Sequence, residues 1–143
     1  MNTRDHLAKL SHVPTYYMGR AAQLLGVSPD TVRRWADAGQ LPTRRDENGY
    51  RVADGHDLAA FAVRLATKGV EPGEPQRSSA RNHFPGIITR VVRGDVAAHV
   101  EIQAGPHRVV SLLTREAVDS LELTEGMEAV AAVKSTNVTL ELP

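Results

Sequence analysis

Residues 20–35 read RAAQLLGVSPDTVRRW, and this stretch predicts a helix, a tight turn and a second helix. Gly26 ends the first helix, because glycine readily takes the positive φ that a sharp turn needs. Ser28 is a favourable N-cap for the second helix, and Pro29 suits its first position. The apolar residues of the two helices, which recur at helical spacing, are Ala22, Leu25, Val27, Val32 and Trp35. The rest of the N-terminal half is expected to pack around this pair.

The second predicted helix has an apolar side and a charged side. At about 100° per residue, Val32, Trp35 and Ala36 fall on one face. The opposite face carries the charged residues Asp30, Arg33, Arg34 and Asp37. A helix with a packed back and an arginine-bearing front suits the major groove of DNA. An ordinary helical hairpin with a solvated charged face would give the same pattern.

A β-hairpin is predicted directly after the helical pair. Gly39 ends the second helix as a C′ residue. Residues 43–45 and 50–52 are two short strand candidates on either side of an Asn-Gly pair, which is a strong hairpin signal. The hairpin carries three arginines and Tyr50, and such groups bind phosphates by charge and hydrogen bonds. This hairpin would be the wing of a winged helix.

The run GRAAQLLGVSPDTVRRWADAGQLP (residues 19–42), followed by RRDENGYR (residues 44–51), resembles the MerR-like and excisionase-like winged-helix families. The resemblance covers residues 16–65. It implies a winged helix-turn-helix domain that binds double-stranded DNA, and it implies no particular effector. The residues expected at the DNA are Ser28, Asp30, Thr31, Arg33, Arg34, Arg44, Arg45, Tyr50 and Arg51.

Composition and charge are consistent with two small domains. The 143 residues include 41% hydrophobic residues, enough for globular cores. Residues 1–70 carry ten Lys and Arg against seven Asp and Glu, whereas residues 71–143 carry seven against ten, so the halves are +3 and −3. A basic N-terminal half and an acidic C-terminal half suit a DNA-binding domain joined to a second domain of another kind. The absence of cysteine excludes disulfides, thiolate metal sites and cysteine nucleophiles.

Stretches rich in polar residues, proline and glycine predict where the domains begin and end. Residues 1–15 are expected to be a polar lead-in, either disordered or a frayed helix. Residues 16–69 are expected to form the winged helix-turn-helix domain, with Asp54 as the N-cap of its third helix. Residues 70–78 contain two prolines, a glycine and polar residues, so they are expected to be a linker. No signal peptide or membrane span is recognisable, so the protein is expected to be cytoplasmic.

From residue 79 onward the pattern changes to short strands. The five candidates are residues 87–92, 97–102, 108–113, 127–133 and 138–142. One short helix is expected at residues 114–121, with Thr114 as its N-cap. Five short strands with one small helix indicate an OB-like five-stranded β-barrel in residues 79–143. The whole chain is therefore predicted to be of the α+β class.

Two polar segments lie beside the strands of this predicted barrel. Residues 79–82 read SARN and precede the first strand, and residues 134–137 read KSTN and lie between the last two strands. Backbone N–H groups and hydroxyls in such loops can surround an oxyanion, with Lys or Arg charge behind them. Each segment alone would equally suit an ordinary Ser- and Asn-rich turn.

The order of motifs S-A-R-N-x-x-x-G, V-x-x-G-x-V, S-L-L-T-x-E-A-V-x-x-L-x-L-x-E-G and V-K-S-T-x-V resembles the Mop/TOBE domain over residues 78–142. The resemblance implies an OB-like barrel that binds molybdate or tungstate at interfaces between subunits. By motif position, it assigns oxyanion binding to Ser79, Ala80, Arg81, Asn82, Ser111, Lys134, Ser135 and Thr136. The chain departs from the pattern at Val109-Val110, where a threonine is frequent, and at His83 and Phe84.

Only one such unit is present, so the resemblance also implies a homo-oligomer, either a dimer or a hexamer. The sequence thus predicts a molybdate- or tungstate-responsive, DNA-binding transcriptional regulator. The alternatives are a DNA-binding protein whose barrel only oligomerises it, and an intracellular molybdate store. No enzyme is predicted, because no nucleophile–base set, bare-cation metal cluster or Walker-type loop is recognisable. His99 and His107 are interpreted as structural or exposed, since no carboxylate partner is recognisable near them.

Overall fold

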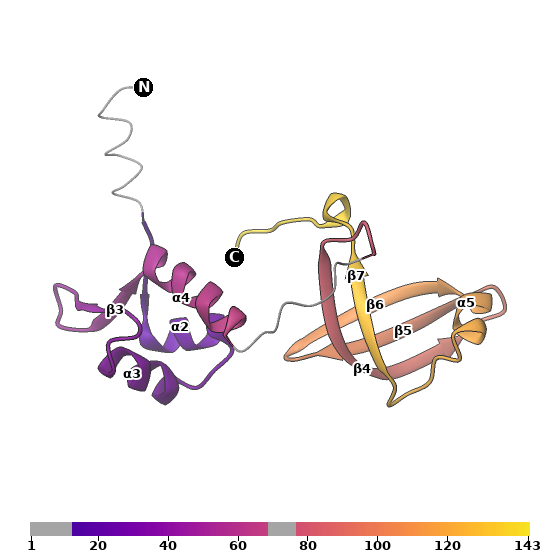
Figure 1. The fold of residues 1–143 in the computed structure, drawn as a ribbon, viewed down its shortest axis with the longest axis horizontal. Helices are drawn as coiled ribbons and strands as arrows, with labels where there is room; N and C mark the ends of the chain where they lie inside the picture. Colours follow the sequence, from indigo (N-terminus) through magenta and orange to yellow (C-terminus); the bar gives the residue numbers. More distant parts are fainter. Residues whose placement is uncertain (1–12, 69–76) are drawn as a thin grey trace, which may run out of the picture. The chain divides into compact units, whose positions relative to one another are not determined.

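The computed structural model describes residues 13–68 and 77–143. The chain divides into two compact units, Met1–Gly73 and Glu74–Pro143, and both can be followed in Figure 1. The division falls inside the stretch predicted to be a linker, residues 70–78. Residues 70–76 of that stretch, and residues 1–12 of the predicted lead-in, lie outside the described residues. No helix among the described residues is both long and apolar enough to span a membrane.

The first unit contains the predicted helical pair, the hairpin and the third helix. Its elements are β1 (Thr15–Tyr17), α2 (Met18–Leu25), α3 (Pro29–Asp37), β2 (Arg44–Arg45), β3 (Arg51–Asp54) and α4 (Gly55–Thr67). The three strands form an antiparallel sheet of order β1-β3-β2. Strand β1 is a correction, because Thr15 was assigned to a disordered or helical lead-in. Three residues are too few to show strand alternation, and β1 exists through its pairing with the distant β3.

The two local signals that define the helical pair, at Gly26 and Ser28, are confirmed. Gly26 has φ of 72° and ends α2 in the left-handed conformation. The Ser28 hydroxyl accepts a hydrogen bond of 3.2 Å from the Thr31 N–H at the start of α3. Asp54 is the N-cap residue of α4, but its carboxylate makes no capping hydrogen bond. Instead it accepts from the Arg44 guanidinium at 3.1 Å, because β2 brings that charge beside it.

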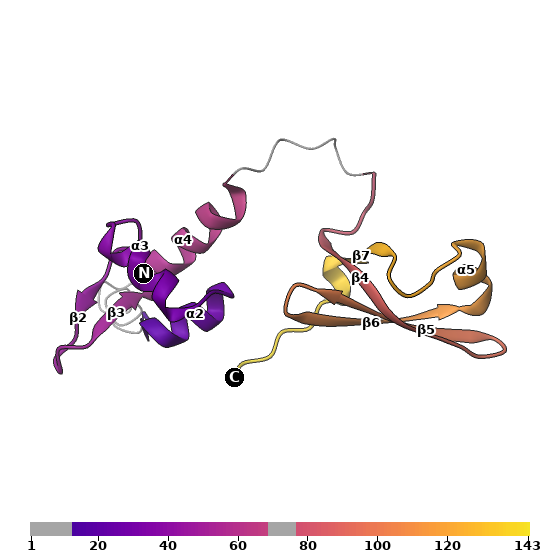
Figure 2. The ribbon, with the colours of Figure 1, turned by 90° about the horizontal axis from the view of Figure 1, so that it is seen from below.

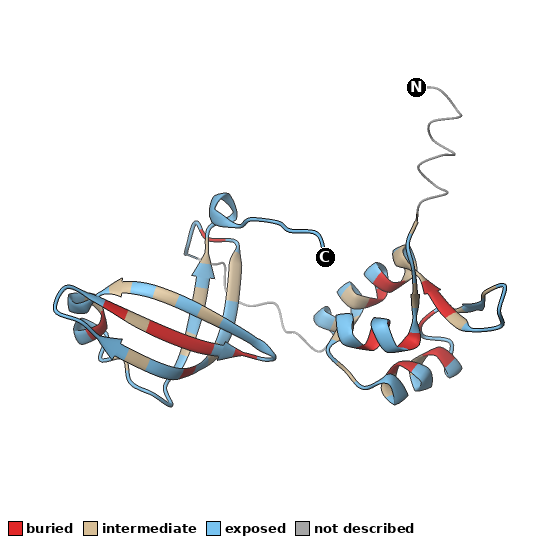
Figure 3. Ribbon diagram, turned by 180° about the vertical axis from the view of Figure 1, so that it is seen from behind, coloured by how far each residue is buried: buried red, intermediate tan, exposed pale blue. Residues whose placement is uncertain are grey.

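A small core joins the three helices of this unit to β3. Buried residues from each element meet there, and Figure 3 shows them on the inner faces of the helices. They are Met18, Ala21, Ala22, Val32, Ala36, Leu41, Ala53, Leu58 and Phe61. Trp35 packs against this core while remaining partly exposed, and its ring centroid lies 5.2 Å from that of Phe61. The core holds α3 and the hairpin in a fixed relation.

The second unit is a curled antiparallel sheet with one short helix. Its elements are β4 (Asn82–Arg93), β5 (Ala97–Ala104), β6 (His107–Thr114), α5 (Arg115–Ser120), β7 (Glu128–Val133) and the 3₁₀ turn η1 (Ser135–Asn137). The strand order is β6-β5-β4-β7. Four of the five predicted strands and the predicted helix are therefore confirmed, including the Thr114 cap, whose hydroxyl accepts from the Ala117 N–H at 3.1 Å.

The sheet curls at β4, because β4 pairs with one strand along its first part and with another along its second part. Residues Asn82 to Ile87 pair with β7, and Ile87 to Arg93 pair with β5, with a bulge between Ile88 and Arg90. At Gly86 a Cβ would lie only 2.4 Å from the Gln103 carbonyl oxygen, so only glycine permits this close approach of β4 to β5. Figure 2 shows β4 twisting from one partner to the other.

The prediction of a fifth strand at residues 138–142 is wrong, because no strand is present there. After η1 the chain is extended but pairs with no strand among the described residues. Leu140 and Leu142 are 90% and 95% exposed. The alternating pattern is that of a strand, but a strand needs a neighbour to supply its hydrogen bonds. The second unit is therefore a half-barrel of four strands rather than a closed barrel of five.

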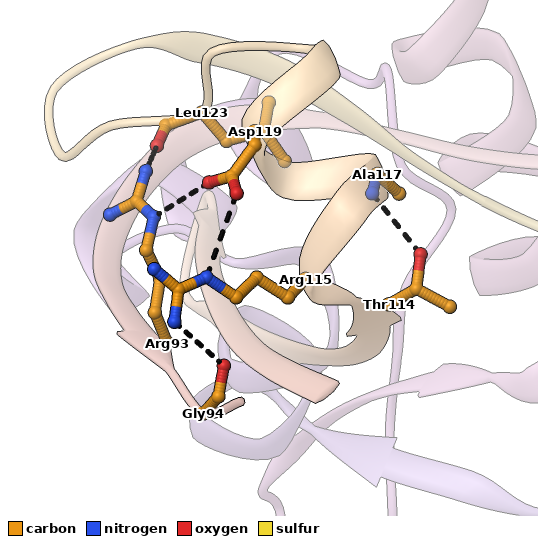
Figure 4. A network of polar contacts seen from close by, with 7 residues as sticks. All are labelled: Arg93, Gly94, Thr114, Arg115, Ala117, Asp119 and Leu123. Atoms are coloured by element: carbon orange, nitrogen blue, oxygen red, sulfur yellow. Dashed lines mark hydrogen bonds and ion pairs between the residues drawn. The ribbon is translucent and has the colours of Figure 1, made fainter. Parts of the chain in front are cut away.

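A polar network fastens α5 to the C-terminal end of β4 (Figure 4). The Asp119 carboxylate accepts from Arg93 at 3.3 Å and lies 3.6 Å from the Arg115 guanidinium. Arg93 also donates to the Leu123 carbonyl at 3.0 Å, and Arg115 donates to the Gly94 carbonyl at 3.3 Å. This network belongs to the end of β4 remote from Asn82, so it supports the fold rather than the oxyanion segments.

Candidate nucleic-acid interface and oxyanion site

The first unit has a cleft between α3, the hairpin and the start of α2. Its volume is about 590 Å³, and its lining residues are Tyr17, Met18, Gly19, Arg33, Tyr50 and Arg51. Arg33 comes from the charged face of α3, whereas Tyr50 and Arg51 come from the hairpin. The fold thus brings together predicted DNA-contacting residues from both elements. Tyr17, which the sequence did not single out, stands edge-on to Tyr50 at a centroid distance of 6.0 Å.

The two faces of the hairpin separate its three arginines. Arg45 pairs with Arg51 across the strands, whereas Arg44 pairs with Val52. Because successive side chains of a strand point to opposite faces, Arg45 and Arg51 share one face and Arg44 lies on the other. There Arg44 forms its ion pair with Asp54. The sequence predicts that all three arginines contact DNA, and only the strand register shows that they lie on different faces of the hairpin.

The tip of the hairpin is organised by Asp46. Its carboxylate accepts hydrogen bonds from the Asn48 N–H at 3.0 Å, the Tyr50 N–H at 2.8 Å and the Tyr17 hydroxyl at 3.1 Å. Desolvation acts to raise the pKa of Asp46, but these donors and the nearby Arg44 charge outweigh it and lower that pKa below its usual 3.8. The hydrogen bond from the Tyr17 hydroxyl to Asp46 raises the pKa of Tyr17, and the negative charge of Asp46 raises it further. Asp46 therefore acts as an anionic anchor of the turn.

The predicted DNA-contacting side chains of α3 and the hairpin are exposed or half-buried, and they are paired with one another or with neighbours. Arg33 pairs with Asp30 at 2.9 Å, and Arg51 pairs with Asp37 at 2.7 Å. At the start of α3 the Ser28 and Thr31 hydroxyls lie 2.8 Å apart, and Arg34 donates to Thr31 at 3.4 Å. Arg45 donates to the Gly49 carbonyl at 3.2 Å. Exposed ion pairs contribute little stability, so an approaching phosphate can replace these carboxylates at small cost.

In the second unit the two polar segments meet at adjacent strand ends. Asn82 pairs with Val133 in the β4–β7 ladder, and its side-chain amide donates to the Val133 carbonyl at 3.1 Å. Residues 79–82 therefore lie beside residues 134–136, which follow Val133 directly. The groups that face outward there are hydroxyls, an ammonium and a guanidinium, all of them donors. Seven of the eight residues assigned to the oxyanion thus lie in two segments that adjoin at the Asn82–Val133 pair.

Local hydrogen bonds shape the first of these segments. The Ser78 hydroxyl accepts from the Ala80 N–H at 3.1 Å, and the Ser78 carbonyl accepts from Arg81 at 3.0 Å. The His83 ring lies 3.0 Å from the Ala80 carbonyl through Nε2. Ser78 and His83 were not among the predicted site residues. The doubled serine at residues 78–79 and a polar ring within the motif were the available signals for both.

Ser111 is the eighth assigned residue, and within one chain it does not join the others. It lies in β6, where it pairs with Val100 of β5. Strands β6 and β7 are the opposite edges of the sheet. The Ser111 side chain lines the interior of the half-barrel, a cavity that Val133 also lines. Its assignment stays a prediction.

The other polar cluster of this unit centres on Glu101, the one buried charged residue among those described. His99 Nε2 lies 3.4 Å from the Glu101 carboxylate, and Arg108 forms an ion pair with the same carboxylate. The expectation that His99 has no carboxylate neighbour is therefore wrong, because residues two apart in a strand share a face. Among the described residues, no group of three His, Cys, Asp or Glu side chains could hold a metal ion.

Two known families match this chain. The TOBE domain family matches residues 78–140, and the MerR family regulatory protein family matches residues 17–52. Molybdenum-pterin-binding protein 2 of Clostridium pasteurianum is 36% identical over 63 residues, which are 43% of this chain and 93% of that protein. The two matched regions contain the half-barrel and the helical pair with its hairpin.

Two longer relatives align over more of the chain. Molybdenum-pterin-binding protein MopB of Rhodobacter capsulatus is 30% identical over 106 residues, and the transcriptional repressor DcmR of Methylorubrum extorquens is 35% identical over 104 residues. Each alignment covers 71% of this chain. The chain spans only 38% of the length of either relative.

Proposed function

Because the chain belongs to the TOBE-domain family and also carries a MerR family regulatory domain, we propose that it is a DNA-binding transcriptional regulator that responds to molybdate or tungstate. In this proposal residues 16–69 are the DNA-binding domain and residues 79–143 are the oxyanion-binding domain, joined by a linker at residues 70–78. The relatives support both the oxyanion-binding part and the DNA-binding part of the proposal, since one is a molybdenum-pterin-binding protein and another is a transcriptional repressor. We propose no catalytic role.

The observation that carries the oxyanion half of the proposal is the hydrogen bond between Asn82 and the Val133 carbonyl. It fixes two donor-rich segments against each other, with Lys134 supplying positive charge. Hydrogen bonds between charged donors or acceptors are about twice as strong as neutral ones, and an oxyanion accepts several at once. In one chain most residues of these segments are exposed, so we propose that a second subunit covers the anion.

The cleft between α3 and the hairpin supports the DNA half of the proposal. In a winged helix-turn-helix domain the second helix enters the major groove, and here the exposed face of α3 would present Arg33 and Arg34 to base edges. Arg45 and Arg51 on one face of the hairpin would bind phosphates. A homodimer would present two such domains to two half-sites.

One experiment separates this proposal from its two alternatives. Calorimetric titration of the full chain with molybdate, tungstate, sulfate and phosphate is repeated after the chain has been saturated with a duplex selected from a random pool. A regulator requires that molybdate change the DNA affinity and that DNA change the molybdate affinity by the same factor. DNA binding with no anion binding would favour a barrel that only oligomerises the protein. Anion binding with no DNA binding would favour an intracellular store.

A further inference from the structure

The turn of the hairpin lies outside the core of the first unit. Strand β2 is two residues long, and its ladder with β3 consists of two residue pairs. The core cluster of this unit, as far as the structure describes it, includes no residue between Leu41 and Ala53. Figures 1 and 2 both show the turn projecting beyond the helices. Because an isolated short hairpin is marginally stable in water, other contacts must hold its arginines in position.

Two of the described side-chain hydrogen bonds join residues 45–51 of the hairpin to the helical pair. Arg51 donates to the Asp37 carboxylate, at the end of α3, at 2.7 Å. The Tyr17 hydroxyl, at the start of α2, donates to the Asp46 carboxylate at 3.1 Å. Tyr17 occupies the N-cap position of α2, but its side chain makes no capping hydrogen bond there. Its hydroxyl therefore serves the hairpin rather than the helix that it precedes.

The Asp46 carboxylate connects Tyr17 to the turn because its two oxygens have different partners. Oδ1 accepts from the N–H groups of Asn48 and Tyr50, whereas Oδ2 accepts from the Tyr17 hydroxyl. The Tyr17 ring also stands edge-on to the Tyr50 ring, with an angle of 87° between their planes. Tyr50 directly precedes Arg51 in the chain. The position of Tyr17 is thus transmitted to the residue beside a predicted phosphate-binding arginine.

A DNA phosphate would affect these two contacts differently. Arg51 has to exchange the Asp37 carboxylate for the phosphate, and this exchange removes the tie between the hairpin and α3. The side chain of Asp37 is 69% exposed, so the exchange costs little. The Tyr17 hydroxyl carries no charge, so an approaching anion competes much less for it. Of the two contacts, the one between Tyr17 and Asp46 can therefore persist on DNA.

We propose that Tyr17 is a positioning residue for DNA binding, which holds the hairpin in place while Arg51 exchanges its carboxylate partner for a phosphate. The role rests on the proposed function, since it matters only if the hairpin arginines bind DNA. Tyr17 needs no contact with DNA in this role. It acts through Asp46 and the turn on Arg45 and Arg51, which share one face of the hairpin.

Tyr17→Phe tests this role because it removes the hydroxyl but keeps the ring and changes no charge. With the full chain and the duplex selected from a random pool, we expect the affinity to fall about threefold to tenfold, the range for one hydrogen bond. The slope of log affinity against log salt should also fall, by up to about 0.9 for each phosphate contact that the arginines lose. A neutral substitution lowers this slope only when charged contacts elsewhere are lost. Tyr16→Phe is the matched control, since the Tyr16 ring packs against the core, and its affinity and slope should equal those of the parent chain.

Asp46→Ala shows whether Tyr17 acts through the turn. In that chain the Tyr17 hydroxyl has lost its acceptor, so adding Tyr17→Phe should lower the affinity much less than it does in the parent chain. Equal losses in the two backgrounds would mean that Tyr17 contacts DNA itself and would overturn the proposal. So would an unchanged salt slope in Tyr17→Phe.

Amide hydrogen exchange in the DNA-free chain separates this role from the proposed function. Tyr17→Phe should speed exchange at the Asn48 and Tyr50 amides, and more strongly in an Asp37→Asn chain, where the tie to α3 is also weakened. Unchanged exchange in both backgrounds would overturn the proposal even if the parent chain binds DNA. A parent chain that binds no duplex would overturn the proposed function, and faster exchange would then still show that Tyr17 holds the hairpin.

Discussion

The side-chain amide of Asn82, at the start of β4, donates a 3.1 Å hydrogen bond to the carbonyl of Val133, at the end of β7. This contact joins residues 51 positions apart and sets the spacing between the two donor-rich segments. Lys134 follows Val133 directly and brings the one ammonium group of the cluster to that junction. The contact therefore places a full positive charge next to hydroxyl and amide donors.

Replacing Lys134 by Ala is expected to weaken binding of molybdate and tungstate while leaving the fold intact, because Lys134 is exposed and forms no ion pair among the described residues. Loss of a hydrogen bond to a charged group costs about 1.5–3 kcal/mol, or about tenfold to a hundredfold in affinity. Calorimetry measures the affinity, and thermal melting checks the fold. Lys68→Ala, at the end of α4, is the matched control. Unchanged molybdate affinity in Lys134→Ala would remove this residue from the site.

The hairpin arginines should contribute unequally to DNA binding. Arg45→Ala is expected to weaken binding to all duplexes and to reduce the slope of log affinity against log salt by about 0.9, the value for one phosphate contact. Arg44→Ala is the control, since Arg44 lies on the other face and pairs with Asp54. Fluorescence anisotropy over a salt series measures both. Equal losses from the two changes would refute the assignment of the phosphate-binding face.

Trp35 should act through stability rather than through base stacking. It packs on Phe61 at a centroid distance of 5.2 Å but remains partly exposed. We therefore expect Trp35→Ala to cost about 2–3 kcal/mol, below the roughly 3–5 kcal/mol that full burial gives. Circular dichroism melting measures this loss, with Tyr50→Ala, on an exposed side chain, expected to melt normally. A Trp35→Ala protein that melts normally yet fails to bind DNA would contradict this role.

The turn of the hairpin should loosen in acid. The pKa of Asp46 lies below 3.8 in the folded chain, so its stabilising effect is complete above the unfolded value and is lost as the pH falls through the folded value. NMR shifts of the Asn48 and Tyr50 amides should follow that titration, since both donate to this carboxylate. In Asp46→Asn the acid-dependent change should disappear. A carboxyl that titrates above 3.8 would contradict the anchoring role of Asp46.

Local signals in the sequence predicted most of the fold. The Gly26 turn, the Ser28 and Thr114 caps and the Asn48-Gly49 hairpin each depend on neighbours within a few residues, and all are present. The errors concern pairing between distant segments. Strand β1 exists only beside β3, and the predicted strand at residues 138–142 has no partner within the described chain.

For the candidate sites, too, the sequence predicted what depends on local motifs and missed what depends on contacts between distant residues. Motif order assigned the residues that surround the Asn82–Val133 junction, because those segments flank paired strands. It did not separate Arg44 from Arg45, since the face of a hairpin residue depends on register. It also missed Tyr17, which reaches the hairpin tip through its hydrogen bond to Asp46 over 29 positions. Contacts between distant residues of this kind produce no periodic pattern that can be recognised in a sequence.

The anion preference follows from the chemistry of the donors. None of the groups at the junction is a carboxylate; they are the hydroxyls of Ser79, Ser135 and Thr136, the Asn82 amide, the Arg81 guanidinium and the Lys134 ammonium. Phosphate retains at least one proton at pH 7, so that proton would either face a donor or force a hydroxyl to accept from the anion instead of donating to it. This mismatch costs about 1–3 kcal/mol, which corresponds to about tenfold to a hundredfold in affinity.

Protonation cannot separate molybdate, tungstate and sulfate, because all three are fully deprotonated at pH 7. Sulfate is smaller, so its oxygens would leave several donors without contact, whereas molybdate and tungstate are nearly equal in size. We therefore expect molybdate and tungstate to bind about equally and both to bind far more tightly than sulfate or phosphate. Competitive calorimetry at pH 7 ranks the four anions, and lowering the pH tests whether protonation weakens phosphate further. Sulfate binding as tightly as molybdate, or no molybdate binding by the assembled protein, would reject the oxyanion site and leave the barrel as an oligomerisation domain.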